Sequence, residues 1–205
     1  ISHFFWRICM LEEMRSLDIK ELNKMIEKED KEGRITEKCY WNDLWNCVVE
    51  EQANDYTYAE VKDALPLLVS EVNYRQRRYK ANSNEMGVDI RKGDICYIDF
   101  GPAYINEIGF QHFGLILSIF HNKAFVIPMS GNYEAYQKAY SKTNPKGKRH
   151  LMKLGRIKGM NKTSVLFIND AKFINTARII DVKAHLDIHS NLFKEIKERV
   201  IQSLE

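Results

Sequence analysis

The chain has 205 residues, of which 44% are hydrophobic and 29% are charged, a balance typical of a globular protein with one large core or two smaller ones. The net charge of +3 is unevenly distributed, since residues 1–87 carry 13 basic and 17 acidic side chains and residues 88–205 carry 18 basic and 11 acidic. The four cysteines show no spacing of a zinc site or a disulfide framework, which favours a reducing, cytoplasmic location. The apolar opening at residues 1–11 is too short to cross a bilayer and lacks a small-residue cleavage site.

Amphipathic helices are predicted for the first 80 residues. A capping-box pattern at Asp18 starts the first helix, the second covers about residues 37–52, and a Thr-x-x-Glu pattern at Thr57 starts the third. Pro66 is expected to kink or divide this third helix. Met10 precedes a good helix start, which leaves two interpretations of residues 1–9: an upstream remnant, or part of the domain.

A change of composition follows the helices. Residues 73–80 are basic and aromatic, a pattern that can bind nucleic acid but is more typical of a solvated helix end. Residues 81–87 are rich in Asn and end in Gly, as in a linker. The sequence therefore predicts a helical domain over residues 1–80, a linker over 81–87 and a second domain over 88–205.

In the second domain the hydrophobic period changes from 3.6 to 2. Short apolar runs separated by turn residues predict a small β-barrel, with strands near residues 94–100, 112–120, 124–129, 150–154, 164–168 and 176–180. A tight hairpin at residues 121–123, with Asn122 tolerating positive φ, joins the second and third runs. This pairing would bring His112 and Ser130 to the same end of the sheet, although a one-residue slip would separate them.

Several motifs in these strands carry a family resemblance. The first run ends in Asp99-Phe100-Gly101-Pro102, and the second begins after Gly109 and ends at Ser118. With the later strands at 125–130 and 164–172 and a closing helix at 191–204, these segments resemble the PemK/MazF family of toxin endoribonucleases. The resemblance covers about residues 88–205.

The resemblance implies an α+β fold, in which a small SH3-like barrel of the PemK/MazF type carries a C-terminal helix and follows an α-helical N-terminal domain. It further implies the toxin of a type II toxin–antitoxin system, which cleaves single-stranded RNA without a metal to a 2′,3′-cyclic phosphate and a 5′-hydroxyl. The expected partners are a cognate antitoxin and a second copy of the chain, and no cofactor is expected.

One position departs from the family pattern, because His112-Phe113 stands where the family has Arg-Pro. Metal-free RNA cleavage needs a base, an acid and positive charge around the phosphorus, and histidine suits the proton transfers near neutral pH. His112 and Ser130 are therefore the catalytic candidates, and Gln111 and Lys172 are expected to contact the substrate. A lone histidine at a strand start is also commonly an ordinary hydrogen-bonded residue, so both interpretations stay open.

A basic segment lies between residues 138 and 162. It contains no Asp or Glu and nine cationic residues: Lys138, Lys142, Lys146, Lys148, Arg149, Lys153, Arg156, Lys158 and Lys162. Such runs are often merely solvated, but repelling charges at this density also favour a polyanion. We expect a phosphate-tracking loop in which Lys146, Lys148 and Arg149 contact RNA, with nearby tyrosines available to stack on bases.

Two further questions stay open in the sequence. His185 and His189 have the spacing of a helical metal pair, but Ser190 is the expected N-cap of the helix that follows them and no third ligand is evident, so no metal is expected. Since the Arg-Pro pair is missing, the alternatives to an enzyme are a non-catalytic barrel that binds RNA or protein and a gyrase-inhibiting toxin of the same fold. The helical front could inhibit, dimerise or recruit.

Overall fold

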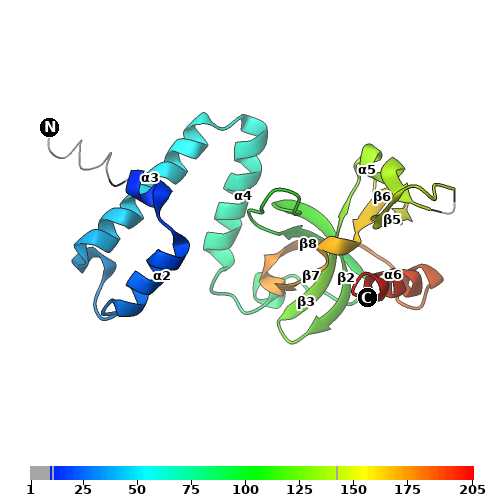
Figure 1. Ribbon diagram of the computed structural model, residues 1–205. Helices are drawn as coiled ribbons and strands as arrows, with labels where there is room; N and C mark the ends of the chain where they lie inside the picture. The colour runs from blue at the N-terminus through cyan, green and yellow to red at the C-terminus, as the bar shows by residue number, and fades with distance from the viewer. Residues whose placement is uncertain (1–9, 11, 142) are drawn as a thin grey trace. The chain divides into compact units, whose positions relative to one another are not determined.

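The computed structural model describes residue 10, residues 12–141 and residues 143–205. Residues 1–9, the possible upstream remnant, lie outside the described residues. The chain divides into two compact units, Ile1–Ala64 and Leu65–Glu205, which we refer to as the helical unit and the barrel unit (Figure 1).

Within the described residues, helical residues 12–16 of the helical unit are followed by α2 (Ile19–Lys28), the 3₁₀ turn η1 (Ile35–Glu37) and α3 (Cys39–Tyr58). Asp18 caps α2 as predicted, because its carboxylate accepts a hydrogen bond of 2.9 Å from the amide of Lys20. The small core of this unit is formed by Met10, Leu44 and Cys47.

The boundary between the second and third predicted helices lies further along the chain than the sequence predicted. α3 runs on to Tyr58, and α4 (Val61–Arg77) starts four residues after the expected start at Thr57. The reason is local: the Thr57 hydroxyl donates to the carbonyl of Ala53 at 2.9 Å, a bond that continues α3 in place of capping a new helix. α4 is not divided by Pro66, which lies in its N-terminal part.

Most of α4 belongs to the barrel unit, which differs from the predicted division into residues 1–80 and 88–205. Two polar residues of α4, Ser70 and Asn73, are buried because their side chains donate to the Asp99 carboxylate of the sheet. The expected linker also packs on this unit: η2 (Ser83–Met86) follows α4, and the amide of Ser83 donates to Thr176 Oγ1 at 3.2 Å.

The barrel unit is built on one eight-stranded, strongly bent sheet with the strand order β4-β5-β6-β3-β2-β1-β8 and with β7 pairing with β3. The strands are β1 (Asp94–Asp99), β2 (Gln111–Phe120), β3 (Lys123–Ser130), β4 (Ala139–Tyr140), β5 (Lys148–Gly155), β6 (Ser164–Phe167), β7 (Lys172–Asn175) and β8 (Ile179–His185).

The predicted hairpin joins β2 and β3, with Phe120 paired with Lys123. Its positive φ lies at His121 (51°), however, and not at Asn122. The last predicted strand, at residues 176–180, is wrong in its first half, where η4 (Thr176–Arg178) forms a 3₁₀ turn. The Asn175 side chain accepts a hydrogen bond of 2.8 Å from the amide of Ala177, which starts the turn between β7 and β8.

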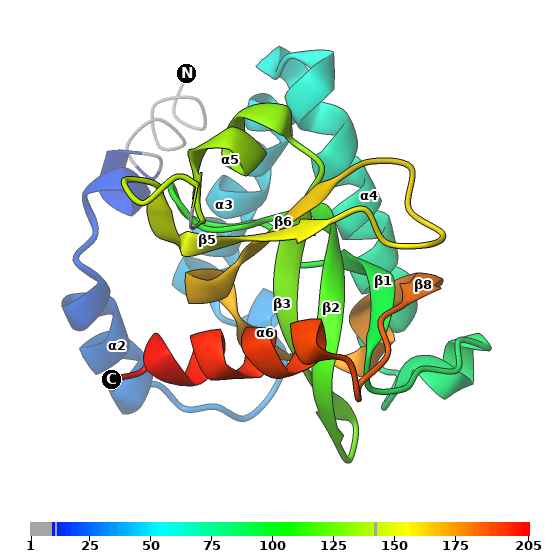
Figure 2. The same ribbon diagram turned by 90° about the vertical axis from the view of Figure 1, so that its right-hand side faces the viewer.

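The closing helix α6 (Asn191–Gln202) covers one face of the sheet, as Figure 2 shows where α6 crosses in front of β3 and β2. Phe193, Ile196 and Val200 bury this face of α6 against the sheet. Ser190 is the N-cap, as predicted, because its hydroxyl accepts from the amide of Phe193 at 3.2 Å.

A second hydrophobic core is formed by another set of buried residues. From β1 and β2 it includes Cys96, Ile98 and Ile116. A short helix, α5 (Tyr133–Lys138), follows β3. The fold class is therefore α+β, a bent sheet with a C-terminal helix that follows an α-helical N-terminal region, as predicted. No helix within the described residues combines the length and the apolar composition needed to cross a membrane.

Candidate active site

The two catalytic candidates lie at the same end of neighbouring strands. His112 pairs with Ile98 of β1, and the next residue of β2, Phe113, pairs with Met129 of β3. In this antiparallel register His112 and Ser130 each lie one residue beyond the Phe113–Met129 pair. The hairpin therefore brings them to one end of the sheet, as the sequence predicted.

Burial decides the charge state of His112. The imidazole is half-buried, and loss of hydration lowers the pKa of His112 below its ordinary value of 6.5. Because the neutral form is favoured at neutral pH, this side chain is suited to accept a proton. It does not supply the permanent positive charge that an arginine would bring to the same position.

Ser130 is half-exposed, and no acceptor for its hydroxyl hydrogen is seen among the described residues. Its Oγ accepts a hydrogen bond of 3.1 Å from the amide of Asn132, which uses an oxygen lone pair. A serine hydroxyl carries one donor hydrogen besides its acceptor sites. Ser130 can therefore donate to an anionic oxygen while the bond from Asn132 fixes its position.

Gln111 is held inside a polar network. Its Nε2 lies 3.1 Å from the carbonyl oxygen of Pro66, 2.9 Å from Ser70 Oγ and 3.1 Å from Asp99 Oδ1. These acceptors occupy the amide nitrogen, so a contact between Gln111 and a substrate would have to use the amide oxygen.

The centre of this network is Asp99, which sequence reasoning assigned to a motif but not to a structural role. Its side chain is only 3% exposed and accepts hydrogen bonds from Ser70 (2.6 Å), Asn73 (3.0 Å) and the amide of Gly101 (3.1 Å). Gly101 has a φ of 79°, a left-handed value that favours glycine. The Asp-x-Gly spacing thus starts the turn that leads from β1 to His112.

A second acidic residue, Asp170, lies in η3 (Ile168–Asp170), two residues before Lys172. Burial raises the pKa of Asp170, whereas Lys172, the amide of Ile108 and His150 act in the opposite direction. Lys172 itself is half-buried, with its Nζ 5.6 Å from the centre of the Phe100 ring. The sequence offers no signal of the altered acidity of Asp170, because that acidity depends on burial.

The basic segment was expected to be a loop, but β4 and the whole of β5 lie within it. Lys146 lies in the turn before β5, and Lys148 and Arg149 start that strand with exposed side chains. The guanidinium of Arg149 lies 5.9 Å from the centre of the Tyr140 ring, and that of Arg199 lies 5.3 Å from it. No contact seen among the described residues joins these cations to His112 or Ser130.

The His185 side chain contacts a carboxylate, that of Asp94. Its Nδ1 lies 2.8 Å from Oδ1 of Asp94, a carboxylate that also accepts from the amide of Arg91 at 2.8 Å. This arrangement joins the start of β1 to the end of β8, where Asp94 and His185 are paired.

No protein-family model and no curated protein matches this chain. Among solved structures, MazF (Form-I) from Deinococcus radiodurans is similar over 56% of this chain and 96% of its own, with 13% identity and a TM-score of 0.42. The Mycobacterium tuberculosis toxin MazF-mt6 is similar over 54% and 95% of the two chains, with 12% identity and a TM-score of 0.38. A mycobacterial endoribonuclease in complex with its cognate antitoxin is similar over 57% and 95%, with 9% identity and a TM-score of 0.39. The matched region is the C-terminal part of the chain, where the sequence resembles the PemK/MazF family.

Proposed function

We propose that the barrel unit is a toxin endoribonuclease that cleaves single-stranded RNA without a metal, leaving a 2′,3′-cyclic phosphate and a 5′-hydroxyl. One observation carries the proposal: His112 and Ser130 stand at the positions where the family pattern has Arg and Thr or Ser, and they lie at the same end of β2 and β3. A cognate antitoxin and a second copy of the chain are the partners that the sequence resemblance implies.

In this proposal, neutral His112 takes the proton of the 2′-hydroxyl, which then attacks the phosphorus. The lowered pKa of His112 supports the role of a base. Ser130 donates its hydroxyl hydrogen to a phosphate oxygen, and Lys172 adds positive charge.

The departing 5′ oxygen needs an acid. Asp170 is the candidate acid in this proposal, since it lies two residues before Lys172 and burial raises its pKa. Lys146, Lys148 and Arg149 bind the RNA backbone in this proposal, since all three are exposed on a segment without acidic residues.

A second candidate function is a non-catalytic barrel that binds RNA or a protein. The observation that favours it is also found at His112: a neutral imidazole leaves the phosphate without the fixed cation of the family pattern. The two candidates differ in one measurable property, which is cleavage.

The test is cleavage of a fluorogenic single-stranded RNA by the whole chain in EDTA. We expect cleavage by the wild-type chain, none by His112→Ala, and a loss of about 100-fold in Ser130→Ala, as for removal of one donor to a developing charge. His189→Ala is the matched control because His189 is exposed, and it should cleave like the wild type. Circular dichroism should show the same fold in all four proteins.

Full activity of the His112 variant would overturn the assignment of the base. RNA binding by the wild-type chain without cleavage would overturn the enzyme and support the non-catalytic barrel.

A further inference from the structure

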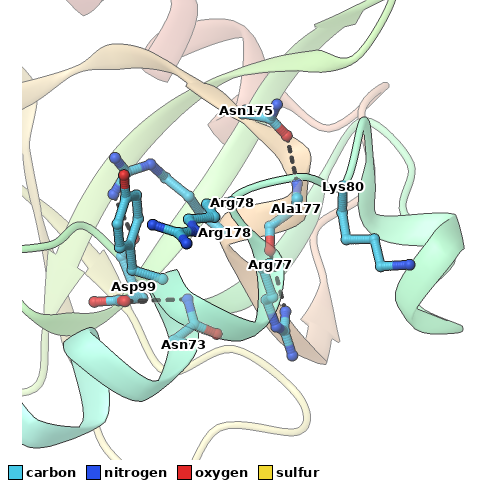
Figure 3. A pocket seen from close by; sticks show the side chains of 9 residues that line it. Asn73, Arg77, Arg78, Lys80, Asp99, Asn175, Ala177 and Arg178 are labelled. Carbon is cyan, nitrogen blue, oxygen red and sulfur yellow. Dashed lines mark hydrogen bonds between the residues drawn. The ribbon is translucent and has the colours of Figure 1, made fainter. Parts of the chain in front are cut away.

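A pocket of about 160 Å³ lies between the C-terminal part of α4 and η4, within the barrel unit. Figure 3 shows its lining, with Asn73 pointing at Asp99 and Arg178 beside them. The volume is well above the space that a single water molecule needs. Neither His112 nor Ser130 lines this pocket.

The lining is strongly cationic. The pocket is lined by one carboxylate, that of Asp99, and by four cationic side chains: Arg77, Arg78, Lys80 and Arg178. Asp99 is already satisfied by the donors of Ser70, Asn73 and Gly101 described above. The Nζ of Lys80 lies 3.7 Å from a carboxylate oxygen of Glu85, which does not line the pocket. For Arg77, Arg78 and Arg178 no ion pair is seen among the described residues, so the positive charge in the pocket exceeds the negative charge.

Arg77 forms one wall and has an unsatisfied donor. Its Nη1 donates to the carbonyl oxygens of Ala177 (3.2 Å) and Ile179 (2.6 Å), which are neutral acceptors. Its Nε is buried and has no hydrogen-bond partner within the described part of the chain. A buried polar atom without a partner is uncommon and is often explained by a bound water or ion that the structure lacks.

Two further arginines are in a position to bind an anion. Arg178 is exposed and donates from Nη1 to the carbonyl oxygen of Asp99, at 3.3 Å. The guanidinium of Arg78 lies 5.9 Å from the centre of the Tyr74 ring and 4.7 Å from that of Tyr79. Tyr74 lines the same pocket and is 56% exposed, so an aromatic face lies beside the cations.

This combination suits a phosphate group that is attached to a base. Guanidinium groups present several fixed N–H donors, which match the oxygens of a phosphate. An exposed aromatic ring beside them offers a surface on which a base can stack. We propose that the pocket binds the phosphate group of a nucleotide, with Arg78 and Arg178 contacting the phosphate and Tyr74 contacting the base.

The phosphate can come from a free nucleotide or from an RNA strand, and the proposal holds whether or not the barrel unit cleaves RNA. The test is isothermal titration calorimetry on the whole chain with three probes: inorganic phosphate, adenosine 5′-monophosphate and a 2′-O-methyl oligoribonucleotide, which cannot be cleaved through its 2′ position. The variant is Arg78→Gln with Arg178→Gln. The matched control is Lys62→Gln with Arg75→Gln, two exposed residues of α4 outside the pocket that carry the same total charge.

We expect the pocket variant to bind at least one probe about tenfold more weakly or worse, as for loss of a charge-assisted hydrogen bond, and the control to change by less than about twofold. A loss confined to phosphate and the mononucleotide identifies a free nucleotide as the ligand. A loss that includes the oligoribonucleotide identifies an RNA strand. Tyr74→Ala should weaken the mononucleotide but not inorganic phosphate.

The proposal is overturned if the wild-type chain binds none of the probes, or if the control loses as much affinity as the pocket variant. Thermal melting of both variants checks the fold. Because no step of this experiment measures cleavage, its failure is distinguishable from failure of the proposed endoribonuclease.

Discussion

The Ser70 hydroxyl donates a hydrogen bond of 2.6 Å to the Asp99 carboxylate, across 29 positions of the chain. Both side chains are buried, Ser70 being 3% exposed and Asp99 also 3%. A carboxylate in such a place is costly unless donors surround it. α4 supplies two of these donors, so it completes the folded barrel unit and does not merely precede it.

Removing one donor should therefore destabilise the barrel unit. We expect Ser70→Ala and Asn73→Ala each to lower the free energy of unfolding by about 1–3 kcal/mol, because each leaves a buried carboxylate with one hydrogen bond fewer. Urea unfolding measures the change. Gln76→Ala, an exposed position on the same helix, should have a much smaller effect, and an equal effect of Gln76 and Ser70 would contradict the network.

A fragment that starts after α4 should be less stable than one that contains most of α4. Residues 88–205 lack Ser70, Asn73 and Arg77, whereas residues 65–205 keep the whole compact unit. Loss of the partners of a buried charge is worth about 3–5 kcal/mol, so the shorter fragment should unfold at a clearly lower urea concentration. Equal midpoints for the two fragments would show that α4 is dispensable for the fold.

The pH dependence of RNA cleavage should report His112. Since the base must be neutral, kcat/KM should rise as His112 loses its proton, and the midpoint of this acidic limb should lie below pH 6.5 because burial lowers the pKa. The free energy of unfolding should change with pH in the same direction. Because the folded state favours neutral His112, the protein should become less stable as the pH decreases from 6.5 through the lowered pKa. An acidic limb centred above pH 6.5 would contradict the burial of His112.

The basic segment should determine the salt dependence of RNA binding. Each phosphate contact on a single strand contributes about 0.7 to the slope of log K against log salt concentration. Reversing the charge of Lys146, Lys148 and Arg149 to Glu should therefore reduce this slope by about 2. Fluorescence anisotropy with an uncleavable RNA at several salt concentrations measures it.

The control for this experiment is a triple reversal elsewhere on the barrel unit, at the exposed residues Lys123, Lys194 and Lys197. It changes the net charge by the same amount but should leave the slope almost unchanged. Similar slopes for the two triple variants would show that the basic segment is not part of the RNA-binding surface.

The elements that the sequence predicted well are those with local signals. β1, β2 and β3 follow from short apolar runs bounded by turn residues. α6 was expected from the family resemblance, with Ser190 as its N-cap. The register of β2 and β3 follows from a tight hairpin, so the joint position of His112 and Ser130 was predictable as well. In each case, the residues that decide the structure are close together in the chain.

The features that the sequence did not predict depend on partners far away in the chain. Arg77 donates to the carbonyl of Ala177 across 100 positions, and Asn73 donates to Asp99 across 26. Neither hydrogen bond is indicated by a pattern of neighbouring residues. The sequence therefore predicted that α4 belongs to a separate helical domain. The lowered pKa of His112 and the raised pKa of Asp170 arise from burial, which is set by the packing of whole elements. Composition and periodicity thus determine which segments become strands and helices, whereas the acidity of the candidate groups and the cationic pocket beside α4 arise only when distant segments pack and exclude water.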